Sequence, residues 1–404
     1  MPRVLLAILV AGLLIRLGLS LARDASDRGA LASLPDQREY LTLGRNLLFG
    51  RGLVMRDDRL DVNVYAFRAP GYPMFVAMCG GSIRAIRIAQ ALLDTSTILA
   101  AYLLARKFLP VAACGVAICF VAFNPYLVYF SSLILSETLF IAMLAWGMYF
   151  LINGRRWWIG SLLLAASLLV RPGAMLLPIV LALASAGSKR DLLIRPILTA
   201  VMTVAMLFPW AYRNHRVIDH WVWTTTNGGV TLYDGFNPGA TGGSDQGFVF
   251  DRMDELRAIA NEKDRSDYLA KCATDYIRQN PLRAIKLTIK KIARIWSPVP
   301  LSADASRSTL VVLVSAIYSV PLFALTAAGL FLRKLSAQAK VYLLVPAIYL
   351  TVIHALSVGS LRYRLPADVS MAVVAASVVA RQARKFTADE LLNATRAHQP
   401  RPPV

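Results

Sequence analysis

Long apolar stretches separated by short basic clusters run along the chain from its first residues to about residue 381. Each stretch approaches the roughly 20 residues that an α-helix needs to cross a bilayer. The pattern therefore predicts an all-α polytopic membrane protein with about ten transmembrane helices. The expected helices cover residues 4–22, 84–105, 109–130, 136–153, 157–170, 173–187, 194–212, 308–332, 340–358 and 366–381.

Residues 157–187 make this number ambiguous, because Arg171 and Pro172 interrupt an apolar stretch that is long enough for one over-long helix. Proline cannot continue a regular hydrogen-bond ladder, so we expect two short or tilted helices that meet near the outer surface. Two passes also place the basic clusters on one side, as the positive-inside rule requires, with both termini cytoplasmic. These clusters are Arg106-Lys107, Arg155-Arg156, Lys189-Arg190-Arg195, Arg333-Lys334-Lys340 and Arg381-Arg384-Lys385.

Two large segments, residues 23–83 and 213–307, are external in this topology. The first contains LPDQREYLTLGRNLLFGRG, residues 34–52, which reads as an amphipathic helix. The second begins with the turn-rich TTTNGGVTLYDGFNPGATGG and is then expected to be helical over residues 251–296, with apolar residues at helical spacing opposite Lys and Arg. Both segments thus predict amphipathic helices that lie on the outer membrane surface.

The composition supports this interpretation, since 56% of the residues are hydrophobic and only 17% are charged, against about 25% in soluble domains. The net charge is +20, but the basic residues lie mostly between apolar stretches, and no stripe of basic and aromatic residues predicts nucleic-acid binding. The first apolar stretch has no small-residue cleavage motif and is expected to remain as a span. We expect one membrane domain over residues 1–385 and a disordered cytoplasmic tail over residues 386–404.

Polar residues collect at the expected outer ends of the helices and in the external segments. If the bundle closes on itself, they line a single cavity with a few carboxylates and several arginines. Such a cavity suits a substrate that carries phosphate, because guanidinium groups make paired, charge-assisted hydrogen bonds to phosphate oxygens. The candidate site residues are Asp36, Glu39, Tyr40, Arg68, Tyr72, Glu137, Arg171, Arg213, Asn214, Arg362 and Arg364.

Simpler interpretations exist for several of these arginines. Arginines at helix ends commonly extend toward lipid head groups, and this role and substrate binding are equally open for Arg68, Arg171 and Arg213. Arg362 and Arg364 are stronger candidates for phosphate binding, because they lie two residues apart in RYRLP on the outside, where the positive-inside bias disfavours them.

Other chemically notable residues favour structural roles. Arg16 and Asp94 lie in the middle of expected spans, and pairing inside the bundle is the favoured interpretation for both charges. His354 has no second ligand at a fixed spacing, so a packed or hydrogen-bonded histidine is expected and no metal site. The cysteines, Cys79, Cys114, Cys119 and Cys272, show no metal-binding spacing.

The order of several short motifs resembles a known family. An Asp-x-x-x-Tyr pattern in DQREYLTLGRNLLFGRG is followed by RAPGYPMF, SETLF, LLVRPG, FPWAYRNHRV, the loop from TTTNGG to GFNPGATGG, and RYRLP. Together these motifs cover most of the chain, and they look like the GT-C glycosyltransferases of the protein mannosyltransferase and aminoarabinose transferase type. The resemblance implies a polyprenyl-phosphate sugar donor and a catalytic aspartate in the first external loop, where Asp36 stands. Family members often carry Asp-Glu at this point, whereas Gln37 follows Asp36 here, so a neighbouring acidic role is either absent or taken by Glu39.

The residues and the resemblance together predict an inverting glycosyltransferase at the extracytoplasmic face of the cell (inner) membrane, without a metal or other cofactor. Asp36 is expected to take the proton from an acceptor hydroxyl on a glycan, lipid or protein, and Arg362 and Arg364 to bind the donor phosphate. The remaining candidates are expected to contact donor or acceptor. The alternative is a transporter or flippase for lipid-linked sugars, which would use the same arginines without chemistry. Transporters usually place such groups near the midplane of symmetric halves, and this chain shows neither feature.

Overall fold

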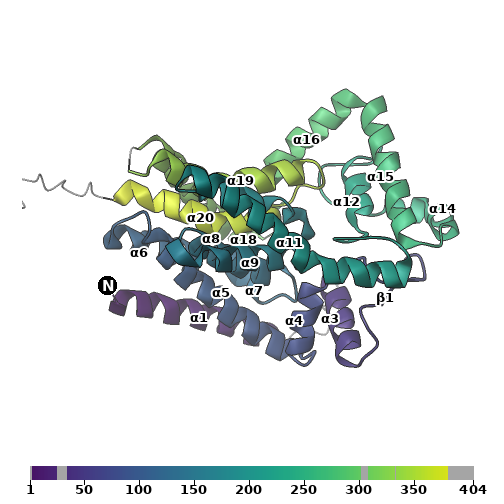
Figure 1. Cartoon of the computed structure of the whole chain (residues 1–404), viewed down its shortest axis with the longest axis horizontal. Helices are drawn as coiled ribbons and strands as arrows, with labels where there is room; N and C mark the ends of the chain where they lie inside the picture. The colour runs from purple at the N-terminus through teal and green to yellow at the C-terminus, as the bar shows by residue number, and fades with distance from the viewer. Residues whose placement is uncertain (1, 25–33, 302–307, 333, 381–404) are drawn as a thin grey trace, which may run out of the picture.

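The computed structural model describes residues 2–24, 34–301, 308–332 and 334–380. Within these ranges the regular secondary structure is helical except for one antiparallel hairpin, in which β1 (Met55–Asp57) pairs with β2 (Val62–Val64). The predicted all-α fold class is confirmed for this part of the chain. Apolar helices run side by side in a bundle, and a second group of helices gathers beyond one end of it (Figure 1). We call this second group, together with the hairpin, the cap.

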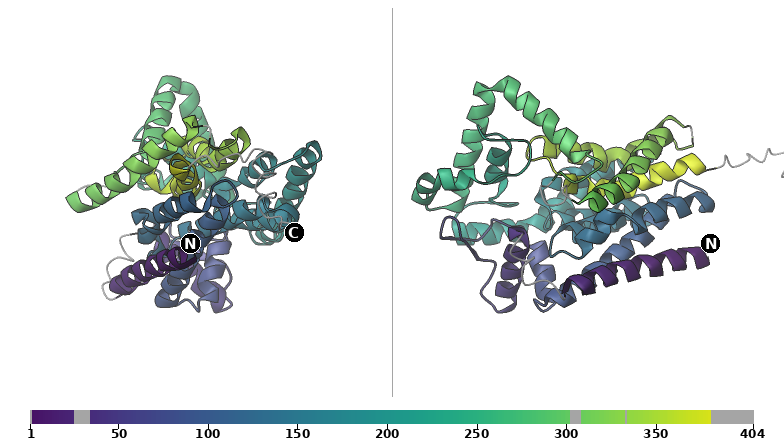
Figure 2. Two further views of the ribbon diagram at one scale, coloured as in Figure 1. Left: turned by 90° about the vertical axis from the view of Figure 1, so that its left-hand side faces the viewer. Right: turned by 180° about the vertical axis from the view of Figure 1, so that it is seen from behind.

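The bundle carries nearly all of the strongly apolar sequence, and Figure 2 shows the same arrangement from the side and from behind. Its helices are α1 (Pro2–Asp24), α5 (Ile83–Ala105), α6 (Val111–Ala122), α7 (Pro125–Ser131), α8 (Glu137–Leu151), α9 (Trp157–Ser167), α10 (Leu177–Ala184), α11 (Lys189–Ile218), α18 (Thr309–Phe331), α19 (Ala337–Ala355) and α20 (Leu365–Ala376). Short 3₁₀ turns lie at Gly154–Arg156 (η1), Pro172–Ala174 (η2), Leu361–Tyr363 (η3) and Ser377–Val379 (η4).

The cap combines parts of the two segments that the sequence places outside the membrane. Its helices are α3 (Pro35–Leu48) and α4 (Gly71–Met78) from the first segment, and α12 (Gly228–Gly235), α13 (Phe248–Asp251), α14 (Met253–Ala258), α15 (Glu262–Gln279) and α16 (Pro281–Ile295) from the second. The amphipathic pattern around residues 34–52 and over residues 251–296 therefore does form helices, as predicted.

The predicted number of ten spans is wrong for the described residues. Five helices are long and apolar enough to cross a membrane, and a sixth candidate arises if α6 and α7, which meet at a bend of 49°, form one broken span. The other four predicted stretches fold into helices that are too short: α8 has 15 residues, α9 has 11, α10 has 8 and α20 has 12. At 1.5 Å per residue even α8 reaches only about 22 Å, less than the roughly 30 Å of a hydrocarbon core.

The predicted interruption at Arg171 and Pro172 is present. Helix α9 ends at Ser167, and Arg171 adopts an extended backbone (φ −138°, ψ 94°) before the η2 turn. A residue that precedes proline avoids the helical region because its backbone meets the proline ring. The break leaves the side chain of Arg171 at the bundle end that faces the cap.

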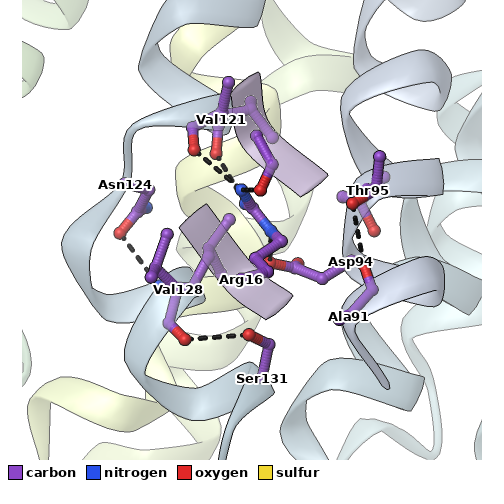
Figure 3. A network of polar contacts seen from close by, with 12 residues as sticks. Arg16, Ala91, Asp94, Thr95, Val121, Asn124, Val128 and Ser131 are labelled. Carbon is purple, nitrogen blue, oxygen red and sulfur yellow. Dashed lines mark hydrogen bonds and ion pairs between the residues drawn. The ribbon is translucent and has the colours of Figure 1, made fainter. Parts of the chain in front are cut away.

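The two charges predicted in mid-span do pair with each other, deep in the bundle (Figure 3). Arg16 Nε on α1 donates to Asp94 Oδ2 on α5 at 2.5 Å, and both side chains are buried. Arg16 also donates from Nη1 to the Ala122 carbonyl at 2.8 Å, at the point where α6 ends. Helix ends leave carbonyls without partners, so this arginine makes the bend between α6 and α7 tolerable in an apolar setting.

Asn124 completes the bend from the other side. Its side-chain oxygen accepts hydrogen bonds from the backbone N–H groups of Tyr126 (2.9 Å) and Leu127 (3.2 Å), which begin α7. Its amide nitrogen donates to the hydroxyl of Tyr318 on α18 at 2.7 Å. The broken segment is therefore satisfied at both helix ends and joined to α1, α5 and α18.

Lys291 departs from the amphipathic pattern of its helix. The sequence places it among the basic residues on the polar face of α16, but the side chain is fully buried, with Nζ 3.2 Å from the centre of the Phe236 ring. The helix approaches its neighbours closely, since a Cβ on Gly235 would lie 2.8 Å from Lys291 Nζ and one on Gly359 would lie 2.6 Å from Lys291 Cα. Burial lowers the pKa of Lys291 to about 7, although the nearby Asp234 opposes this change.

This burial predicts a pH-dependent stability. Between pH 7 and 9 the unfolded chain keeps the Lys291 proton while the folded protein releases it, so the free energy of unfolding should rise with pH by up to about 1.4 kcal/mol per unit. Lys291→Met should be more stable than the parent near pH 7 and should lack this part of the rise. The measurement is the melting temperature of the detergent-solubilised protein across this range. Lys290→Met, at an exposed neighbour, should keep the slope.

Candidate active site

A chain of alternating carboxylates and arginines lies where the bundle meets the cap. Asp36 and Glu39 are one turn apart on α3, and Arg68, between β2 and α4, binds both of them. Arg68 Nη2 donates to Asp36 Oδ1 at 2.6 Å, and Arg68 Nε donates to Glu39 Oε2 at 2.6 Å. One guanidinium thus holds two carboxylates of the first external segment.

Arg362, on η3, continues the chain toward the bundle. Its Nη2 donates to Asp36 Oδ2 at 3.1 Å, and its Nε lies 3.0 Å from Glu137 Oε1. Glu137 Oε1 is also 3.0 Å from Nη1 of Arg171, the arginine at the break after α9. The order is therefore Glu39, Arg68, Asp36, Arg362, Glu137 and Arg171. Six residues predicted from five separate sequence motifs meet here, and their formal charges sum to zero.

Exposure differs along this chain of charges. The side chain of Glu137 is 1% exposed, at the first turn of α8, whereas those of Arg362 and Asp36 are 30% and 27% exposed. A soluble or membrane-bound ligand can therefore reach the contact between Arg362 and Asp36 but not Glu137. Glu137 acts as a buried counter-charge that fixes Arg171 and Arg362.

The electrostatics separate the two carboxylates on α3. The Arg68 guanidinium, aided by Arg362, holds the pKa of Asp36 well below its usual range despite burial. Burial raises the pKa of Glu39, and Arg68 only partly offsets this effect. In this state Asp36 is an ionised but weak base, since both of its oxygens accept hydrogen bonds from arginine.

Helix α3 owes its position to contacts with the bundle and with α4. Gln37 Oε1 accepts a hydrogen bond from the backbone N–H of Ile134 at 2.9 Å, which fixes the first turn of α3. The Tyr40 ring packs edge-on against Tyr72, with ring centres 4.8 Å apart, and lies under the Arg68 guanidinium. Asp36 also occupies the first turn of α3, where the helix dipole favours a negative charge.

Gly71 brings the first external segment against the bundle. Its N–H donates to the Leu169 carbonyl at 2.7 Å, and a Cβ at this position would lie 2.7 Å from the same oxygen. Any larger residue would push α4 away from the chain that precedes Arg171. The glycine in RAPGYPMF therefore serves to place Arg68 and Arg171 at one end of the bundle.

Three further predicted site residues lie outside this chain of charges. Arg213 donates to the carbonyls of Tyr65 (2.7 Å) and Leu53 (2.8 Å), so it ties α11 to the first external segment. Asn214 is buried and donates to the Val222 carbonyl at 2.8 Å. Both contacts hold the cap together and leave no group directed at a ligand. Tyr72 is also buried, and its hydroxyl donates a hydrogen bond to Gln90 Oε1.

Arg364 is the clearest departure from the prediction. Its side chain is 1% exposed, and it donates to the carbonyls of Ser297 (2.6 Å) and Ile295 (3.2 Å) and to Ser319 Oγ (3.1 Å). Asp368, one turn later on α20, lies 3.5 Å from its Nε. Arg364 thus closes the end of α16 and has no free face for a phosphate.

Two contributors were missed in the sequence. Glu262 on α15 accepts backbone hydrogen bonds from Tyr65 (3.1 Å) and Ala66 (2.7 Å), and so anchors the stretch that leads to Arg68. Tyr363 stacks on His354 with ring centres 3.8 Å apart, and the guanidinium groups of Arg171 and Arg362 flank its ring. Neither lies in a spacing that signals such a role, although the Tyr in RYRLP stands between two candidates.

Among the residues that the structure describes, no three His, Cys, Asp or Glu side chains come together in a way that could hold a metal ion. Comparisons with protein-family models, curated proteins and solved structures gave no match for this chain.

The contacts of Arg364 predict a structural phenotype. Arg364→Gln leaves the buried Asp368 with the Asn124 amide as a hydrogen-bond donor but without a cationic partner, and breaking such a pair from one side costs about 3 to 5 kcal/mol of unfolding free energy. The double variant Arg364→Gln/Asp368→Asn should regain part of this loss, as measured by melting temperature in detergent. Arg38→Gln, which breaks the exposed pair with Asp58, is the control and should change stability by less than about 1 kcal/mol. An unaltered melting temperature for Arg364→Gln would show that its contacts are dispensable.

Proposed function

We propose that the protein is an inverting glycosyltransferase that moves a sugar from a polyprenyl-phosphate donor to an acceptor hydroxyl at the extracytoplasmic face of the cell (inner) membrane. One observation carries the proposal: Asp36 and Arg362 form the most exposed contact of a charge-balanced chain of side chains at the junction of an apolar bundle with its cap. A donor anchored in the bilayer by its tail presents its phosphate at this depth. The partners are thus the lipid donor, surrounding membrane lipids, and an acceptor that is a glycan, a lipid or a protein.

The proposed reaction is a single displacement. The acceptor oxygen forms a bond to the anomeric carbon while the bond from that carbon to the phosphate oxygen breaks, and the electron pair leaves with the phosphate. Asp36 takes the acceptor proton within hydrogen-bond reach and later releases it to water. Attack from the face opposite the leaving group inverts the anomeric centre.

Arg362 is the proposed phosphate ligand. It is the most exposed of the three arginines in the chain of charges, and it already binds a carboxylate oxygen. A guanidinium can stabilise the charge that gathers on the departing phosphate, which is commonly the largest catalytic contribution. Arg171 and Glu137 hold Arg362 in place from the buried side. Arg68 positions Asp36, and Glu39, whose pKa is raised by burial, orients the acceptor hydroxyl.

The proposal also states how the protein is oriented in the membrane. The start of α1 and the end of α20 lie at the bundle end opposite the cap (Figure 1). The basic cluster Arg106-Lys107 follows α5, and the cluster Lys189-Arg190 begins α11. The positive-inside rule assigns both connections to the cytoplasm. The cap and the chain of charges are then extracytoplasmic.

The test of the base is Asp36→Asn. This amide keeps the shape of the side chain but cannot accept the acceptor proton, so the rate of sugar transfer from polyprenyl phosphate should fall about 10² to 10⁴-fold. Glu39→Gln should cost less, because it removes an orienting contact. Transfer of radiolabelled sugar in liposomes measures both. Near-normal transfer by Asp36→Asn would remove Asp36 from the reaction, and an inactive Glu39→Gln beside an active Asp36→Asn would move the base one helical turn along α3.

The test of orientation is cysteine labelling in a cysteine-free background. Asp254→Cys, at an exposed position in the cap, should react with a membrane-impermeant maleimide in intact cells, or in spheroplasts if there is an outer membrane. Gly187→Cys, exposed between α10 and α11, should react only after the membrane is permeabilised. The opposite labelling pattern would place the cap in the cytoplasm.

A further inference from the structure

In the chain of charges (the charge chain), the proposed base Asp36 is already paired with two arginines when no substrate is bound. Asp36 accepts from Arg68 with one oxygen and from Arg362 with the other, so both oxygens already face a cation, which lowers their affinity for an acceptor proton. The charge chain has as many arginines as carboxylates, and a bound phosphate adds a negative charge. A phosphate that binds one of these guanidinium groups therefore competes with the carboxylate that is already paired with it.

We propose that the donor phosphate displaces Asp36 from Arg362, so that binding of the donor itself frees the catalytic base. This inference rests on the proposed function and adds an order of events to it. The donor must bind before Asp36 can act on the acceptor, and Asp36 competes with the phosphate for the same guanidinium.

The geometry selects the contact between Asp36 and Arg362 as the one that opens. It is the longer of the two contacts to Asp36, at 3.1 Å against 2.6 Å for Arg68. It is also the most exposed contact in the chain, whereas the other side of Arg362 faces the buried Glu137 at 3.0 Å. Arg362 can therefore exchange one partner for phosphate while Glu137 keeps its side chain in position.

The exchange matches the charges of the reaction. Before transfer, Asp36 and the phosphodiester of the donor each carry one negative charge. After transfer, Asp36 holds a proton and the leaving polyprenyl phosphate carries the second charge, so the total is unchanged. A guanidinium that moves from the carboxylate to the phosphate follows this transfer, and it restores the basicity that pairing with arginine had suppressed.

Competition between Asp36 and phosphate for Arg362 has a consequence that is not expected for a phosphate site without such a competitor. Removing the charge of Asp36 should tighten the binding of phosphate, because the ligand no longer has to displace a carboxylate. We expect full-length Asp36→Asn in lipid nanodiscs to bind undecaprenyl phosphate at least about tenfold more tightly than the parent, which is a change of about 1.4 kcal/mol. Undecaprenol, which has the same tail and no phosphate, should bind both proteins equally.

Further variants distinguish displacement of Asp36 from Arg362 from a non-specific effect of removing one negative charge. Asp36→Ser should reproduce the gain if Asp36→Asn folds poorly, and Asp58→Asn, an exposed Asp in the same segment, should leave affinity unaltered. Arg362→Gln should weaken binding, and the gain from Asp36→Asn should vanish in the Arg362→Gln background. A gain that persists there contradicts exchange at Arg362.

The remaining outcomes distinguish this inference from the proposed function. Equal or weaker phosphate binding by folded Asp36→Asn and Asp36→Ser, beside measurable binding by the parent, would overturn the exchange and leave the glycosyltransferase proposal standing. Absence of undecaprenyl phosphate binding by the parent and by every variant would overturn both.

Discussion

Pairing of buried charges is the constraint on which this structure depends. An ion in an apolar interior loses several kcal/mol of hydration, and only a partner with good geometry makes its burial tolerable. Arg16 pairs with Asp94 between α1 and α5, and Arg364 pairs with Asp368 at the base of the cap. Each arginine also donates to main-chain carbonyls at a helix end, of α6 in one case and of α16 in the other. The ion pairs therefore fix where broken or terminating helices sit, as well as neutralising charge.

The fold was largely predictable because apolar periodicity reports where helices form. It reports less well how far each helix continues, since a stretch such as residues 157–187 keeps its hydrophobic character through a backbone break. The packing of α8, α9 and α10 against longer neighbours allows them to remain short of a full crossing. The burial of Lys291 was not predicted for a similar reason. The amphipathic pattern of α16 indicates that its basic face meets water, but Gly235 and Gly359 allow neighbouring backbone to approach and cover Lys291.

The site was predictable as a group of residues but not residue by residue. Arg362 and Arg364 present the same signal in RYRLP, yet only Arg362 reaches the charge chain. With about 3 residues per turn in a 3₁₀ segment such as η3, two positions are about 240° apart around the helix, so the two side chains leave in different directions. The sequence shows the charges and their depth, but the local backbone decides which of them join the chain of charges. Glu262 was invisible for the converse reason, because it acts only through backbone groups nearly 200 residues away.

In the proposed reaction, stability and catalysis make opposite demands on Asp36, and the chain of charges offers a way to meet both. A carboxylate held by two arginines is stable at the junction of bundle and cap, but the same pairing lowers its affinity for a proton. A base that stayed free at this depth would be a half-buried, unpaired charge, and its pKa would rise until it became protonated and inactive. Pairing with Arg362 keeps Asp36 ionised while no donor is bound. In the exchange that we propose, the incoming phosphate takes over the guanidinium at the moment when the carboxylate is needed to accept a proton.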